Sequence, residues 1–142
     1  MNIRIYYENV KFRIRKTREI KELLYKVIRE ENMVPGDLLF ILADDTTVLE
    51  VNREFLKHDY YTDVISFNNS VGDTVNGEIY ISIDTVKRNA REYGCRIIEE
   101  TVRVMIHGVL HLCGYEDTGE EDRIRMFERQ EMFLERIRGE LQ

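Results

Sequence analysis

The stretch H-G-V-L-H-L-C-G-Y-E-D, residues 107–117, decides how the C-terminal half of the chain folds. Its apolar periodicity predicts the last turns of a helix that begins near Ile97 and ends near Cys113. Gly114 follows as the helix breaker, because glycine readily adopts the left-handed conformation that ends many helices. We therefore expect the chain to turn back at Gly114 and to bring Asp117 alongside the helix.

His107 and His111 in this stretch are four residues apart, so on a helix their imidazoles lie on one face, one turn from each other. Both rings can bind one ion, and the carboxylate of Asp117 can supply a third ligand from the returning turn. Three protein ligands leave a position for water, which is typical of catalytic zinc. We predict one Zn²⁺ bound by His107, His111 and Asp117; imidazole also binds nickel and iron, which stay open as alternatives.

Other interpretations of these residues remain at this point. The two histidines are also compatible with hydrogen-bonded core residues, and two histidines with one carboxylate also occur in non-haem iron sites. Cys113 is disfavoured as a fourth ligand, because it lies two residues past His111 and faces elsewhere on a helix. Asp117 is one of several acidic residues in a polar segment, any of which could instead cap a helix or face solvent: Glu116, Asp117, Glu120, Glu121 and Asp122.

The spacing H-x-x-x-H-x-x-G-x-x-D matches the zinc signature of the metzincin proteases. Those enzymes carry a glutamate directly after the first histidine as general base, and here that position is Gly108. Peptide hydrolysis by the same mechanism is therefore disfavoured.

Hydrophobic periodicity elsewhere predicts an α+β fold: a single domain, residues 1–142, with about four strands in a mixed sheet packed with about five helices. The zincin-like metal site would lie on a helix and the turn that follows it. The strands expected are 2–7, 38–43, 64–67 and 78–83, and the helices expected are 17–32, 45–55, 84–94, 97–113 and 120–138. The strands 64–67 and 78–83 are consecutive, so we expect them to pair antiparallel.

Local signals set the expected boundaries of these elements. Thr17, Asp84 and either Asp44 or Asp45 are candidate N-caps, Pro35-Gly36 marks a turn, and 68–77 is a turn-rich loop. The first helix should bury one apolar face, made of Ile20, Leu23, Leu24, Val27 and Ile28.

Composition limits the class of protein. The chain has 142 residues, 43% of them hydrophobic, and lacks both a run of about 18 apolar residues and an apolar signal segment, so we expect a cytoplasmic protein with no membrane partner. Two cysteines are too few for a disulfide scaffold, and we expect both to be reduced. The net charge is −6, but residues 1–29 hold nine Lys/Arg against three Glu. The basic run 11–21 either contacts phosphates or is a solvated, ion-paired surface.

Three segments resemble the YbeY family of endoribonucleases. The family pattern H-G-x-L-H-L-x-G-Y-D-H is similar to residues 107–117, L-N-x-x-Y-R-x-x-D-x-x-T-D-V-L-S-F is similar to residues 51–67, and G-D-I-x-I is similar to residues 77–81. The resemblance implies a metal-dependent endoribonuclease that cuts single-stranded RNA. It implies work on ribosomal RNA, especially at the 3′ end of the small-subunit rRNA, together with the ribosome or its assembly intermediates.

The resemblance places His107 and His111 on the family's first two metal-ligand positions. The chain departs from the family twice: the third ligand, usually histidine, is Asp117, and an arginine thought to serve RNA cleavage is Leu56. Lys57 and His58 are neighbouring candidates to replace that arginine. A non-catalytic, zinc-stabilised ribosome-assembly factor is therefore the second hypothesis, and a metalloprotease is the third.

Further candidates have both a functional and a structural interpretation. Asp63 could orient a ligand histidine or a water, or could be a turn residue at a strand entry. Arg103 lies one turn before His107 and could meet a phosphate. Ser66 is a candidate phosphate contact or an inward strand residue. The candidates for stacking on unpaired bases, or else for ordinary packing, are Tyr60, Tyr61 and Tyr115.

Overall fold

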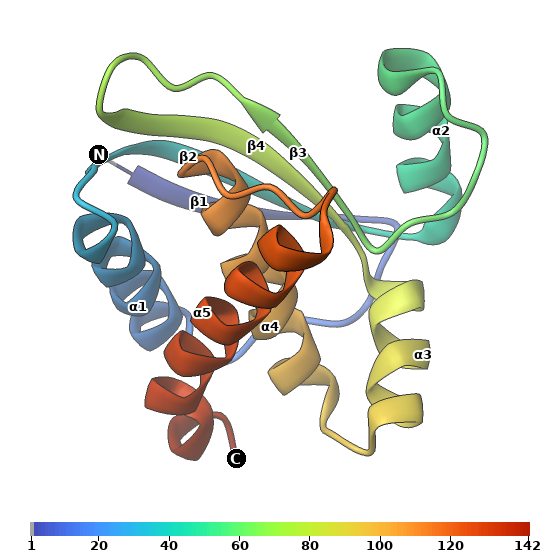
Figure 1. The fold of residues 1–142 in the computed structure, drawn as a ribbon. Helices are drawn as coiled ribbons and strands as arrows, with labels where there is room; N and C mark the ends of the chain where they lie inside the picture. Colours follow the sequence, from blue (N-terminus) through green and yellow to red (C-terminus); the bar gives the residue numbers. More distant parts are fainter. Residues whose placement is uncertain (1) are drawn as a thin grey trace.

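A computed structural model of the chain describes residues 2–142 as an α+β fold built on one four-stranded mixed sheet (Figure 1). This confirms the predicted fold class. The strands are β1 (Asn2–Glu8), β2 (Val34–Ala43), β3 (Val64–Asn68) and β4 (Thr74–Ser82). The helices are α1 (Thr17–Glu30), α2 (Asp45–Leu56), α3 (Ile83–Tyr93), α4 (Ile97–Leu112), α5 (Glu120–Arg138) and a short 3-10 helix, Gly139–Leu141.

The strands lie in the order β1-β2-β4-β3. β1 and β4 both run parallel to β2, whereas β3 runs antiparallel to β4, as the sequence predicted. β2 lies in the middle of the sheet and contacts a core on each face, which explains why residues 38–43 form a continuous apolar run. Leu38, Phe40 and Leu42 belong to the large core on one face of the sheet, while Ile41 and Ala43 belong to a smaller core on the other.

The two faces of the sheet are covered unequally. α1, α3, α4 and α5 lie on one face and α2 alone on the other (Figure 1). The buried face of α1 consists of the five residues predicted for it. Helix α4 lies between the sheet and the other helices, and most of its residues are buried, so its C-terminal end, which carries His107 and His111, is held by packing from several sides.

Three local predictions were wrong. Pro35 and Gly36 lie within β2, beside a register shift between Pro35 and Leu38, because an irregularity in the strand pairing accommodates them there. Lys16, in a left-handed conformation, precedes α1 in place of a Thr17 cap. Ser82 caps α3 by accepting a hydrogen bond from the backbone N–H of Thr85.

Asp84 has a tertiary role instead of capping α3. Its carboxylate accepts a hydrogen bond of 2.9 Å from the backbone N–H of Asp45 at the start of α2. Asp44 does cap α2, because its side chain accepts from the backbone N–H of Thr47. β4 also begins earlier than predicted, at Thr74, because pairing with β2 extends it into the expected loop. Among residues 2–142, no helix combines the length and the apolar character needed to cross a bilayer.

Candidate metal centre and substrate cleft

Three side chains meet at the C-terminal end of α4. The Nε2 atoms of His107 and His111 are 3.1 Å apart, and Oδ2 of Asp117 lies 3.6 Å from Nε2 of His107 and 3.4 Å from Nε2 of His111. One ligand atom from each of the three residues lies within 4.8 Å of the others, so the group could hold a metal ion. The structure thus brings together the three residues that the sequence singled out as ligands.

The other ring nitrogen of each histidine is hydrogen-bonded away from this group. Nδ1 of His107 is 2.8 Å from Oε1 of Gln130 on α5, and Nδ1 of His111 is 2.9 Å from the backbone oxygen of Tyr115. A carbonyl oxygen can only accept, so each Nδ1 carries the proton and donates it. Each Nε2 therefore presents a lone pair to the other ligand atoms, which is the tautomer that a metal ligand requires.

The donor set fits a tetrahedral ion. Ligands bound at about 2.0–2.1 Å in a tetrahedron lie roughly 3.4 Å from each other, close to the three separations found here. Burial lowers the pKa of His107, against the opposing effect of its hydrogen bond to Gln130, and so favours the neutral ring. Two facing lone pairs and a carboxylate are stabilised by a cation between them.

Gly114 sets the position of Asp117. Its φ of 104° is open to glycine and strained for other residues, and it closes α4 with two hydrogen bonds, from Gly114 N to His111 O and from Tyr115 N to Leu110 O, both at 3.0 Å. This turn also brings the Tyr115 carbonyl to the His111 ring. The predicted helix breaker is therefore confirmed.

A distant helix holds the turn in place. The Tyr115 hydroxyl donates a 2.7 Å hydrogen bond to Oε1 of Glu31, at the end of α1, and Nε of Arg129 on α5 donates a 2.6 Å bond to the other oxygen of Glu31. Cys113 stays outside the ligand group of the described residues, and burial raises the pKa of its thiol to about 12. The thiol is therefore protonated at neutral pH and is a poor ligand.

Gly108 faces the sheet and not the ligands. A Cβ on Gly108 would lie 2.9 Å from Cγ2 of Ile79 on β4 and 3.3 Å from Oγ of Ser66 on β3. Helix α4 thus packs closely against the sheet between the two histidines. A glutamate at this position, as in the metzincin proteases, would have to displace the helix from the sheet.

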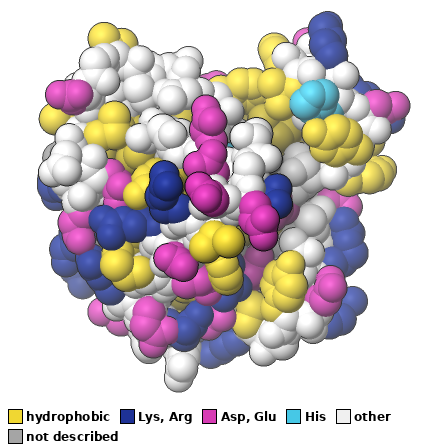
Figure 2. Space-filling view, viewed as in Figure 1, with side chains coloured by type: hydrophobic (Ala, Val, Ile, Leu, Met, Phe, Trp, Pro, Cys, Tyr) yellow, Lys and Arg dark blue, Asp and Glu magenta, His cyan; other side chains and the backbone are white. Residues whose placement is uncertain are grey.

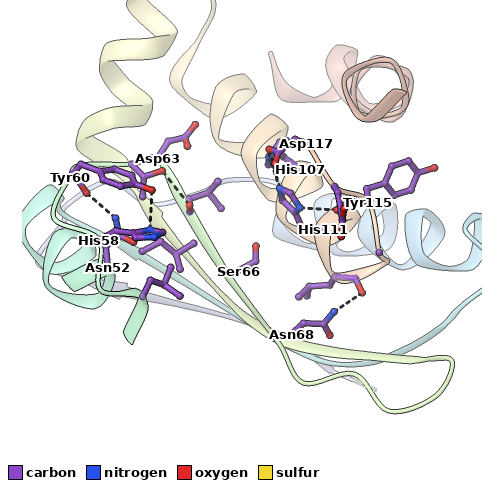
Figure 3. A pocket seen from close by; sticks show the side chains of 17 residues that line it. Asn52, His58, Tyr60, Asp63, Ser66, Asn68, His107, His111, Tyr115 and Asp117 are labelled. Atoms are coloured by element: carbon purple, nitrogen blue, oxygen red, sulfur yellow. Dashed lines mark hydrogen bonds and ion pairs between the residues drawn. The ribbon is translucent and has the colours of Figure 1, made fainter. Parts of the chain in front are cut away.

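The ligand group lies in an open cleft of about 600 Å³ between α4 and the segment that joins α2 to β3. Figure 3 shows His107, His111 and Asp117 on one side, His58 and Tyr60 on the other, and Ser66 between them. In the space-filling view, α2 projects from the body and leaves a hollow bordered by hydrophobic side chains (Figure 2). Leu56 and His58 line the cleft, while Lys57 is absent from its described lining.

Two candidates in this cleft have unusual environments. The hydroxyl oxygen of Ser66 is buried and has no hydrogen-bond partner among residues 2–142. Asp63 lies at the entry to β3, and burial raises the pKa of its carboxyl. Asn52 on α2 is buried and donates a 2.9 Å hydrogen bond to the backbone oxygen of Tyr60, which fixes the cleft wall.

Arg103 lies one turn before His107, as expected, but its guanidinium is already paired with acidic residues. It donates to Glu131 at 2.9 Å and to Glu100. Burial opposes its charge, but these hydrogen bonds raise the pKa of Arg103 well above its usual range. The phosphate contact considered for Arg103 would require these ion pairs to open.

The sequence did not reveal the residues that hold the candidate ligands in place. Gln130 is 23 positions from His107, and Glu31 is 84 positions from Tyr115. Neither stands in a recognisable motif. The only local signal is that both lie within about one helical turn of buried apolar residues, Gln130 within α5 and Glu31 directly after α1.

Comparison with known proteins places the chain in a family. The family model described as "Endoribonuclease YbeY" matches residues 3–138. A protein named "Endoribonuclease YbeY" from Flavobacterium psychrophilum is 44% identical over 117 residues, which are 82% of this chain and 84% of that protein. One of the same name from Bacteroides thetaiotaomicron is 41% identical over 127 residues, 89% of this chain and 93% of that protein.

The fold is shared as well. A solution structure of a protein from Thermotoga maritima superposes with a TM-score of 0.66 at 31% identity, covering 96% of this chain and 90% of that one. Sequence and fold agree over nearly the whole length, and so the chain belongs to the Endoribonuclease YbeY family.

Proposed function

We propose that this chain is a zinc-dependent endoribonuclease of one hydrolase domain that cuts single-stranded RNA, with His107, His111 and Asp117 as the metal ligands. The observation that carries the proposal is the set of three inward-facing ligand atoms on the wall of an open cleft, in a chain of this family. Its partners would be ribosomal RNA and the ribosome or its assembly intermediates, and its reaction would be maturation of the small-subunit rRNA 3′ end.

A zinc ion at this site would supply a Lewis acid for a phosphate oxygen and a water of lowered pKa. The chain's own residues would position the substrate around it. Ser66 offers a hydroxyl without a partner in the described chain, and this hydroxyl can donate to a phosphate oxygen once the cleft wall opens around its buried oxygen. Asp63 lines the same cleft beside His107, and we assign to it the role of orienting a water or the His107 ring.

Arg103 is assigned a positioning role through a chain of hydrogen bonds. Its guanidinium holds Glu131, Oε2 of Glu131 accepts from Nε2 of Gln130 at 3.1 Å, and Oε1 of Gln130 accepts from His107. The carboxamide of Gln130 therefore has only one orientation that satisfies both partners. Arg103 would thus act on the metal through the orientation of His107.

Preference for single-stranded RNA is supported by exposed aromatic rings near the cleft. Tyr60 and Tyr61 are 56% and 60% exposed on the segment that joins α2 to β3. Exposed aromatic rings beside a cleft can stack on unpaired bases, whereas bases inside a duplex are already stacked. Tyr60 stacks on the His58 ring, with ring centroids 5.2 Å apart.

One observation favours the second hypothesis, a zinc-stabilised assembly factor without catalysis. Leu56 lines the cleft at the position where the family resemblance implies an arginine, and an apolar side chain cannot stabilise the charge of a transition state at phosphorus. The protease hypothesis loses support, because Gly108 faces the sheet.

A cleavage assay with controlled metal content tests the proposal. Protein purified without chelator should contain about one zinc per chain and should cut single-stranded RNA faster than duplex RNA. Chelator or His111→Ala should abolish cutting, and added zinc should restore only the wild type. Equal cutting by wild type and His111→Ala would identify a contaminant and overturn the proposal. Loss of melting temperature with chelator, together with retained RNA binding and no cutting, would establish the assembly factor instead.

A further inference from the structure

A second cavity, of about 480 Å³, adjoins the cleft that holds the candidate metal ligands. It lies over α4 between α3 and α5, which Figure 1 shows on either side of that helix. Asp63 and His107 line both cavities. A ligand that reaches the metal ligands can therefore extend into this second space.

The lining of this cavity comes from one face of each helix. On α3, Asn89 and Tyr93 are one turn apart; on α5, Phe127 and Gln130 are one turn apart; Val104 of α4 lies between them. Tyr93 is 63% exposed and Phe127 is 52% exposed, on opposite sides of the cavity. Two exposed rings flanking an opening of this size form a place where a flat aromatic ligand can stack.

The charges in the cavity exclude a phosphate group. Three carboxylates, those of Asp63, Glu100 and Glu131, line it with one arginine, Arg103. That arginine is already hydrogen-bonded to Glu100 and Glu131. The cavity therefore presents acceptors and excess negative charge, which repel phosphate and attract hydrogen-bond donors.

Asn89 adds a neutral carboxamide that can hydrogen-bond to the polar edge of a ligand. It is half-buried in the cavity lining, and its carboxamide makes no hydrogen bond to any other residue in the range 2–142. A carboxamide offers both donors and an acceptor. The cavity thus combines stacking rings, carboxylate acceptors and one free amide.

From these features we infer that the second cavity binds the base of a nucleotide next to the scissile phosphate, and that it prefers adenine and cytosine, which carry an amino group where uracil carries a carbonyl. The inference rests on the proposed function, since it names part of the substrate of that site. Tyr93 and Phe127 stack on the base, and the carboxylates and Asn89 face its polar edge.

The selection follows from the edges of the bases. Adenine and cytosine carry an amino donor where uracil, like thymine, carries a carbonyl acceptor. A carbonyl facing carboxylates leaves acceptors opposite acceptors, which is unfavourable in a partly desolvated cavity. Adenine and cytosine should therefore be preferred over uracil at one position beside the cut.

Binding can be measured without any reaction. Fluorescein-labelled oligo-A, oligo-C and oligo-U are titrated with the full chain in the presence of chelator, and Kd is read from fluorescence anisotropy. Tyr93→Ala combined with Phe127→Ala should weaken binding of oligo-A and oligo-C by about 10-fold and reduce their preference over oligo-U. Tyr93→Trp should keep wild-type binding. Ile124→Ala, which removes an exposed apolar side chain of α5 outside this lining, is the matched control.

An unchanged ratio of oligo-A to oligo-U affinity in the double variant would overturn the inference. Cleavage of a randomised single-stranded RNA by the zinc-loaded protein separates this failure from a failure of the proposed function. Cutting whose base preference is insensitive to the double variant refutes the base site and leaves the nuclease intact. A binding preference that depends on both rings, in a protein that cuts no RNA, supports the base site and refutes the nuclease.

Discussion

Nδ1 of His107 on α4 donates a 2.8 Å hydrogen bond to Oε1 of Gln130 on α5, and Gln130 is 92% buried. This bond leaves Nε2 of His107 unprotonated and turned towards Nε2 of His111. The orientation of a candidate metal ligand therefore depends on a residue from the last helix. That helix contributes no ligand of its own to the group.

We expect Gln130→Ala to weaken zinc binding by about 10- to 100-fold, because partners that orient ligand histidines contribute that much to metal affinity. Competition with a chromophoric chelator measures the change. Glu128→Ala, at an exposed position of the same helix, should bind zinc as the wild type does. Equal zinc affinity in wild type and Gln130→Ala would show that His107 is oriented without Gln130.

Tyr115→Phe should lower the free energy of unfolding by about 1 kcal/mol, because the hydroxyl loses its hydrogen bond to Glu31. Urea denaturation measures this value. The same variant should bind zinc more weakly, because the Tyr115 carbonyl orients His111. A variant with wild-type stability and wild-type zinc affinity would contradict the anchoring of the turn by α1.

Gly108→Ala should destabilise the fold by about 1–3 kcal/mol through overpacking against β4, since the new Cβ would lie 2.9 Å from Ile79 Cγ2. In an Ile79→Ala background the same substitution should cost less, because the clashing atoms are gone. A double-mutant cycle by urea denaturation gives the coupling. Additive effects would mean that α4 does not rest on Ile79.

Leu56→Arg should raise the rate of RNA cleavage by about 10-fold or more, since a guanidinium in the cleft can stabilise charge at phosphorus. Leu56 is 39% exposed, so the fold should tolerate the change. Single-turnover cleavage measures the rate, and Leu56→Met is the control that keeps the apolar character. A rate equal to that of the control would mean that this part of the wall is far from the reacting phosphate.

The ion pair between Arg103 and Glu131 should make stability depend on pH. Burial alone would raise the pKa of Glu131, but hydrogen bonds from Arg103 and Gln130 outweigh it and lower the pKa below 4.5. A folded-state pKa below the unfolded value stabilises the fold above pH 4.5, and this contribution is lost as pH falls through the folded pKa. The stability difference between wild type and Glu131→Gln, measured with chelator present, should therefore shrink below pH 4.5. A difference that stays constant down to pH 3 would contradict this linkage.

The sequence alone determined the candidate ligand group, because the distances within it are set by local geometry. Four residues along a helix bring His107 and His111 to adjacent Nε2 atoms, and a glycine turn of a few residues returns Asp117 to them. The periodicity of the helices and strands likewise sufficed for the fold class. Local caps were harder, since Ser82 and not Asp84 begins α3, and Asp84 is instead bound by the start of α2.

Only the tertiary structure decided what surrounds the candidate ligands. The hydrogen bonds of Gln130 and Glu31 form where segments distant in sequence pack together, and so does the second cavity. The tertiary structure also showed that Gly108 faces the sheet. Close packing of α4 against β4 therefore requires a residue without a side chain at the position where the metzincin proteases carry their glutamate. Contacts between distant segments depend on how whole faces pack, and no local spacing encodes them.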